Sequence, residues 1–353
     1  MRTESVSSRH HVVFVRMVIA GIFGVMVLVV GADAGLRDRM SSASGGKRKQ
    51  LGGGVGESHK RTLTHDGRKR SYRVYVPSSY AKSKPAPLVL AFHGGGGTGR
   101  KMMKSSGFNP VADKHGFLVL YPDGIGKSWN DLRDGGGLRS VKARRKGIDD
   151  VGFVGALLDR IEKDYAIDRK RIYATGISNG AMLSQALAAR LSDRFAAIAP
   201  VAGGMAIPIS KDFDPSSPVS VMVVQGTEDP IVPFEGGAVL KNRAGIISTR
   251  EAIQKWVRHN GCKESPTEEE LADRDPKDGC RIKRISYGGG RRGTEVVLLE
   301  IEGGGHAWPG GRQYAPEAMI GRATGDIDGA ETIWEFFARH AKDTSGLGNS
   351  GDR

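Results

Sequence analysis

GISNG, at residues 176–180, lies between a strand-like run at 171–175 and a helix-like run at 181–190. A serine in such a turn is pushed out of the sheet, and the positive N-terminus of the new helix points toward its hydroxyl. Glycine suits positions 176 and 180 because a side chain there would collide with the neighbouring strand and helix. The segment therefore predicts an α/β protein in which Ser178 is an exposed nucleophile.

Other runs typical of strands lie at 72–76, 87–92, 117–121, 196–201, 219–224 and 295–301. Runs with helical periodicity fill the gaps at 151–165, 250–259 and 328–340, and Asp149 and Asp150 are placed to cap the first of them. Strands that alternate with helices indicate a mostly parallel central sheet with helices on both faces. We therefore predict one catalytic domain over residues 70–342 and a flexible tail at 343–353.

The charge of the chain is concentrated near its start. The 353 residues carry a formal net charge of +14, and residues 1–70 hold 13 Lys and Arg against 5 Asp and Glu. A basic chain can bind nucleic acid, but no recognition motif accompanies this charge. We therefore expect a basic signal segment and a solvated linker, and no nucleic-acid partner.

The N-terminal segment has the pattern of a secretory signal. Residues 17–30 are uncharged and almost wholly apolar, two arginines precede them, and Ala32-Asp33-Ala34 follows as a small-x-small cleavage site. The run is short for a membrane span of about 20 residues, although an uncleaved anchor is the alternative. We predict a signal peptide at 1–34, a disordered basic linker at 35–69, a secreted or periplasmic (cell-envelope) location, and no stable membrane span after cleavage.

The two cysteines are Cys262 and Cys280. Export favours a disulfide between them, with two unpaired thiols as the alternative. No Cys-x-x-Cys motif or cluster of histidines accompanies them, so we expect no metal site and no cofactor.

Two loops after later strands carry the partners that a nucleophilic serine needs. The hydroxyl requires a base to take its proton, and the base requires a group that orients it. Asp229 follows the run at 219–224 and is expected to orient the imidazole, while Glu228 is the neighbour that could be mistaken for it. His306 follows the run at 295–301 and is expected to act as general base and then as general acid. Ser, acid and His in this order form an α/β-hydrolase triad.

A glycine run at 94–97 follows the strand at 87–92. Such a run lets backbone N–H groups turn toward a developing oxyanion. We place the two donors at Gly95 and Asn179, with Gly96 as the reserve choice, and expect His93 to anchor the loop.

Two tryptophans occupy predicted loops near these residues. Trp129 follows the strand at 117–121, and Trp308 lies two residues after His306. Both are candidates to bind substrate as walls of a cleft, and the alternative is that both are packing aromatics.

Seven motifs together resemble one known group. They are FHGGGG at 92–97, YPDG at 121–124, SWND at 128–131, DDVGF at 149–153, GISNGAM at 176–182, QGTEDPIVPF at 225–234 and GGGHAWPGG at 303–311. The chain is similar, over residues 70–342, to the secreted polyhydroxybutyrate depolymerase and feruloyl or acetylxylan esterase branch of the α/β-hydrolases. The resemblance implies Ser178, Asp229 and His306 as the triad, and it also implies pairing of Cys262 with Cys280.

The expected function is therefore that of a serine esterase without a cofactor. Its substrates would be hydroxybutyrate oligomers or polymer, or feruloyl and acetyl esters of plant polysaccharide. One alternative is a secreted serine peptidase of the same fold, and another is a non-catalytic binding protein on a hydrolase scaffold.

Overall fold

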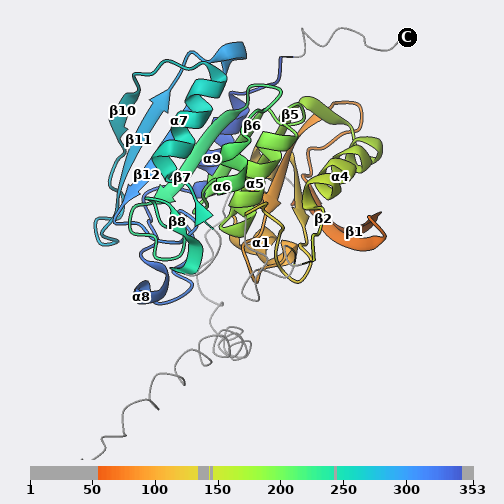
Figure 1. Ribbon diagram of the computed structural model, residues 1–353. Coiled ribbons are helices and arrows are strands. Elements are labelled where there is room, and N and C mark those ends of the chain that lie inside the picture. Colours follow the sequence, from red (N-terminus) through yellow and green to blue (C-terminus); the bar gives the residue numbers. More distant parts are fainter. Residues whose placement is uncertain (1–54, 134–142, 144–145, 242–244, 344–353) are drawn as a thin grey trace, which may run out of the picture. The chain divides into compact units, whose positions relative to one another are not determined.

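The computed structural model describes residues 55–133, 143, 146–241 and 245–343 (Figure 1). The predicted signal peptide, linker residues 35–54 and tail residues 344–353 lie outside these ranges. Within them, no helix combines the length and the apolar character that crossing a membrane demands.

The described residues form one sheet of ten strands in the order β1-β2-β4-β3-β5-β6-β7-β12-β11-β10. In that order the strands are β1 (Glu57–His65), β2 (Arg68–Val76), β4 (Leu118–Pro122), β3 (Ala86–Phe92), β5 (Ile167–Ile177), β6 (Ala197–Val201), β7 (Ser220–Gly226), β12 (Val296–Glu302), β11 (Arg281–Tyr287) and β10 (Thr267–Glu270). The six strands from β4 to β12 in this order are parallel, and the outer strands are antiparallel. The mostly parallel sheet is therefore confirmed.

Helices cover both faces of this sheet (Figure 1). One face packs against α4 (Asp150–Asp164), α5 (Asn179–Arg190), α6 (Ile207–Lys211) and α7 (Thr249–Asn260), and the other against α1 (Gly99–Ser105), α2 (Phe108–His115) and α9 (Gly329–Ala338). Strand β3 shows why both faces are apolar: Leu88, Leu90 and Phe92 point to the first helical layer, whereas Val89 and Ala91 point to the second. The remaining short elements are α8 (Glu317–Ile320), β8 (Gly237–Ala238), β9 (Gly245–Ile246), η2 (Val239–Lys241) and η3 (Arg291–Gly293).

The predicted linker is wrong over its last part, because residues 57–69 belong to a β-hairpin. Strand β1 pairs with β2 in antiparallel register, and His65 lies opposite Arg68. The two residues between them, Asp66 and Gly67, have φ values of 49° and 65°. A two-residue Asp-Gly turn with positive φ at both positions matches the twist of a hairpin. The folded region therefore begins near Glu57 and not at residue 70.

The predicted disulfide is also wrong. Cys262 and Cys280 are both free thiols and both buried. Cys262 packs with the hydrophobic cluster on one face of the sheet, and Cys280 packs with the cluster on the other face. They also flank opposite ends of β11, since Cys280 precedes Arg281 whereas a Cβ at Gly290 would lie 2.7 Å from Cys262 Sγ. A disulfide needs Cα atoms about 4.4–6.8 Å apart, and the intervening sheet prevents this approach.

Candidate active site

The turn between β5 and α5 has the strained geometry that its sequence predicts. Ser178 has φ 58° and ψ −120°, a conformation that costs on the order of 1–3 kcal/mol in a residue with a side chain. A Cβ at Gly176 would lie 2.7 Å from the carbonyl oxygen of Phe92, and one at Gly180 would lie 2.4 Å from the same atom. The predicted collisions are therefore confirmed, and they explain why glycine flanks the serine.

His306 and Asp229 are in direct contact. The Nδ1 atom of His306 lies 2.8 Å from Oδ2 of Asp229, and the two side chains are 6% and 0% exposed. The other carboxylate oxygen of Asp229 accepts hydrogen bonds from the backbone N–H groups of Ile231 and Val232, each at 2.8 Å. These bonds fix the carboxylate so that it can hold one tautomer and one orientation of the imidazole.

Glu228 has a different environment from Asp229. Its side chain is 65% exposed and lies 4.0 Å from Arg322. Asp229 is thus the acid that contacts His306, as the sequence analysis expected.

Ser178, Asp229 and His306 lie at one edge of the sheet. They follow the carboxyl ends of β5, β7 and β12, which are parallel strands of the same sheet. The Ser178 hydroxyl makes no hydrogen bond to any residue in the described ranges.

The glycine loop after β3 distinguishes between the candidate oxyanion donors. The N–H of Gly96 donates to the carbonyl of Lys127 at 2.8 Å, so it is already occupied. The N–H groups of Gly95 and Asn179 make no backbone hydrogen bond to the described loops and turns. A Cβ placed on either Gly95 or Gly96 would meet no atom within 4 Å, so the occupied N–H of Gly96 is what separates the two. The geometry thus favours Gly95 over Gly96.

His93 anchors this loop, as predicted. Its Nε2 accepts the N–H of Gly124 at 3.0 Å, and its Nδ1 lies 2.8 Å from the carbonyl oxygen of Gly94. Burial lowers the pKa of His93, so the ring is neutral and Nδ1 carries the proton. A neutral ring with both nitrogens engaged has a structural role here.

Both candidate cleft tryptophans are buried. Trp129 is 0% exposed, and its ring packs edge-on against Phe92 with centroids 5.4 Å apart. Trp308 is 8% exposed and packs against Phe108 with centroids 6.0 Å apart. This burial favours the packing alternative for both residues.

Three residues near the site were absent from the sequence predictions. Tyr314 is 51% exposed, and its hydroxyl donates to the carbonyl of His306 at 3.0 Å. Asp131 and Arg133 are buried and paired, with 2.7 Å between Oδ2 and Nη2. The sequence signals for them were the aromatic Tyr314 shortly after His306 and the acid Asp131 in the SWND motif. Within the described ranges, the site included, no group of three or more His, Cys, Asp or Glu side chains could hold a metal ion.

A parallel sheet between two helical layers, with a serine turn and an Asp–His pair at its carboxyl edge, defines an α/β-hydrolase. Solved structures share this fold. An acetyl xylan esterase from Aspergillus awamori superposes with a TM-score of 0.52 at 17% identity and covers 79% of this chain and 99% of its own. The dienelactone hydrolase-like phosphotriesterase P91 from metagenomic libraries gives a TM-score of 0.54 at 17% identity. The superposition covers 82% of this chain and 100% of that structure.

The chain belongs to the esterase PHB depolymerase family, whose model matches residues 70–247. The protein named "Putative esterase NocK" of Nocardia uniformis subsp. tsuyamanensis is 31% identical, over 77% of this chain and 80% of its own length. Feruloyl esterase B of Piromyces equi is 29% identical over 67% of this chain, which spans 42% of that relative. Feruloyl esterase C of Emericella nidulans is 25% identical, over 76% of this chain and 83% of its own length. The protein is therefore a carboxylic ester hydrolase.

Proposed function

We propose that the protein is a secreted serine esterase in which Ser178, His306 and Asp229 form a catalytic triad. The observation that carries this proposal is the buried Asp229–His306 pair at 2.8 Å, on the same sheet edge as the strained Ser178 turn. The predicted N-terminal signal supports export to the outside or to the cell envelope.

The reaction begins when His306 Nε2 takes the proton of Ser178 Oγ as this oxygen attacks the ester carbonyl. The carbonyl π electrons move to oxygen, and the N–H groups of Gly95 and Asn179 stabilise the resulting oxyanion. The tetrahedral intermediate then collapses, the C–O bond to the alcohol breaks, and the imidazolium returns its proton to the leaving alkoxide. Asp229 stabilises the imidazolium while it exists.

Deacylation repeats these steps with water. His306 removes a proton from the water molecule, hydroxide adds to the acyl carbonyl, and Ser178 Oγ leaves with the proton from His306. The products are a carboxylic acid and an alcohol. The family supports hydroxybutyrate oligomers or polymer and feruloyl or acetyl esters of plant polysaccharide as the substrate classes.

A fluorophosphonate probe tests the nucleophile directly, because it phosphonylates an activated serine. We expect one mole of probe per mole of protein, on Ser178 by peptide mass mapping, and no labelling of Ser178→Ala. The variant should lose at least about 10⁴-fold in kcat on aryl esters. Labelling of another serine, or an active Ser178→Ala, would refute the triad. A panel of feruloyl, acetyl, short-chain aryl and hydroxybutyrate esters then identifies the acyl group.

A further inference from the structure

Residues 129–131 connect the glycine loop at 94–97 with the turn at 176–180, the two loops that carry the proposed oxyanion donors. The backbone N–H of Trp129 donates to Oδ1 of Asn179 at 2.7 Å. In return, Nδ2 of Asn179 donates to the carbonyl of Trp129 at 3.1 Å and to Oδ2 of Asp131 at 2.6 Å. The side chain of Asn179 therefore uses its oxygen and both of its N–H groups to hold this segment. These three bonds fix the residue and so fix the direction of its backbone N–H.

The same tryptophan also holds the glycine loop. The indole N–H of Trp129 donates to the carbonyl of His93 at 2.8 Å, and His93 immediately precedes the glycine run. The His93 and Trp129 rings are in contact, with centroids 4.8 Å apart. Trp129 thus bonds to both loops, one through its backbone and the other through its ring.

The carboxylate of Asp131, in the same segment, is paired with Arg133. A carboxylate close to the oxyanion would repel the negative charge that develops in the transition state. The Asp131 carboxylate, which is fully buried, accepts hydrogen bonds from Nε of Arg133 at 3.0 Å and from Nη2 at 2.7 Å. Arg133 therefore offsets the negative charge of Asp131, which holds Asn179.

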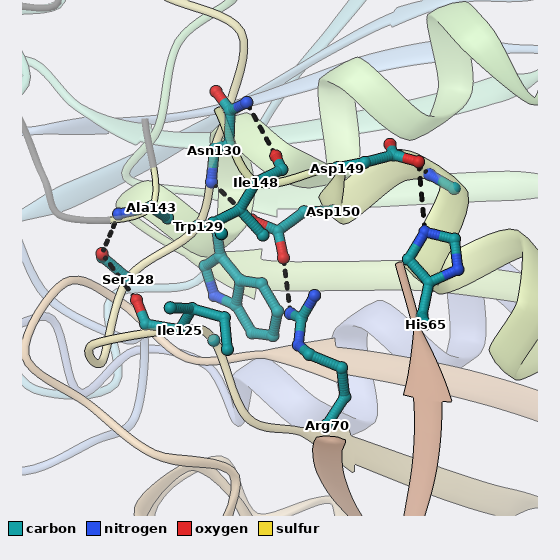
Figure 2. Close-up of polar contacts among 12 residues, drawn as sticks. His65, Arg70, Ile125, Ser128, Trp129, Asn130, Ala143, Ile148, Asp149 and Asp150 are labelled. Atoms are coloured by element: carbon teal, nitrogen blue, oxygen red, sulfur yellow. Dashed lines mark hydrogen bonds and ion pairs between the residues drawn. The ribbon is translucent and has the colours of Figure 1, made fainter. Parts of the chain in front are cut away.

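A buried ion pair fixes the middle of the segment, as Figure 2 shows. The backbone N–H of Asn130 donates to Oδ2 of Asp150 at 2.7 Å, and its side chain donates to the carbonyl of Ile148 at 2.8 Å. Asp150 also pairs with Arg70 from β2, and the two side chains are 0% and 1% exposed. The Arg70 guanidinium lies over the ring of Phe153, 3.8 Å from its centroid. Strand β2 and helix α4 thus fix the main chain at Asn130.

We propose that residues 129–131 are a positioning bridge that sets the separation and direction of the Gly95 and Asn179 N–H groups. Trp129 is its main residue, because it bonds to both loops. This inference rests on the proposed function, because it assigns a role within the oxyanion site. The bridge does not touch substrate. It acts on the transition state, where the oxyanion exists, and not on ground-state binding.

The test is Trp129→Phe, which keeps an aromatic ring and removes the indole N–H together with the five-membered part of the indole. We expect kcat on an aryl ester to fall about tenfold with KM within twofold, since a misdirected donor weakens only the transition state. The affinity for an aryl boronic acid, which forms a tetrahedral adduct on the serine, should fall by the same factor.

Trp256→Phe is the matched control. Trp256, in α7, is also fully buried, and its indole N–H donates at 2.9 Å to Oε1 of Gln185, which lies six residues along α5 from Asn179. We expect a similar decrease in Tm and no loss of kcat. Equal kcat losses in the two variants, or a loss confined to KM, would overturn the bridge.

A second variant decides the question if Trp129→Phe does not fold. Asn179→Ala keeps the backbone donor and deletes all three side-chain bonds to the bridge. The expected result is again a lower kcat and weaker boronic acid binding at unchanged KM, and an unchanged kcat would contradict the proposal. These comparisons apply only if the unmodified protein reacts with the fluorophosphonate, and they are made on unreacted enzyme. Absence of fluorophosphonate labelling in the unmodified protein instead refutes the triad itself.

Discussion

Asp229 contacts His306 through one carboxylate oxygen and the following backbone of its own loop, at Ile231 and Val232, through the other. Oδ2 lies 2.8 Å from the imidazole Nδ1, while Oδ1 accepts two backbone N–H groups. The carboxylate therefore cannot rotate without losing bonds on both sides. This fixed geometry is the basis for the first prediction.

Asp229→Asn should lower kcat by about 10⁴-fold, because an amide at this position can present an N–H to Nδ1 and stabilise the wrong imidazole tautomer. The measurement is the steady-state rate on an aryl ester. Glu228→Gln is the control, because Glu228 is adjacent and largely exposed, and it should retain full activity. The reverse ranking of the two variants would show that Glu228 is the catalytic acid.

The cysteines should behave as two inert thiols. Burial raises the pKa of Cys262 to about 11 and that of Cys280 to about 12, so little thiolate exists at pH 8. We expect an aromatic disulfide reagent to titrate no thiol in the native protein and two thiols after unfolding in guanidinium without reductant. Two thiols that appear only after reduction would establish the disulfide after all.

Gly176→Ala should damage the turn that presents Ser178. The new methyl group would lie 2.7 Å from the backbone of both Gly180 and Phe92, and neither can move without disturbing the sheet. We expect a loss of about 3 kcal/mol in the free energy of unfolding, measured by urea denaturation, together with a large loss of activity. Gly288→Ala serves as the control, because a Cβ there meets nothing within 4 Å.

Glu295 should make the fold sensitive to acid. Hydrogen bonds from His340 at 3.0 Å and Arg339 at 2.7 Å lower the pKa of Glu295 to about 2. A lowered carboxyl pKa stabilises the folded state above the ordinary value near 4.5, and this stabilisation is lost as the pH falls toward 2.

Glu295→Gln should therefore destabilise the protein at neutral pH by at most about 3 kcal/mol, and the difference should vanish near pH 2. Urea denaturation at a series of pH values measures it. Glu335→Gln, an exposed change on helix α9, should show no such dependence. A difference between Glu295→Gln and the unmodified protein that persists at pH 2 would rule out this linkage.

The central sheet and the positions of Ser178, Asp229 and His306 at its edge were predictable from sequence. Buried parallel strands are short apolar runs, and each of the three residues directly follows such a run. The oxyanion donors were less certain, because a glycine run does not say which N–H is free. The bond from Gly96 to Lys127 depends on a loop 31 residues further along the chain.

The sequence did not predict strands β1, β10 and β11, because many of their residues are charged. Strands β1, β10 and β11 have little apolar alternation, and pairing with a neighbouring strand stabilises them instead. The Asp66-Gly67 turn was the one local signal for the hairpin of β1 and β2. The bridge at Trp129 had no comparable signal, since its burial depends on contacts with segments around His93, Asp150 and Asn179.

The two outermost strands of the described sheet carry opposite charge. Strand β1 presents Lys60 and Arg61 at one margin, and the exposed β10 presents Glu268, Glu269 and Glu270 at the other. An open strand exposes N–H and C=O groups that could recruit another molecule into a continuous ribbon. Like charges deter two copies of the same margin from joining, so they disfavour self-association by sheet extension between identical strands.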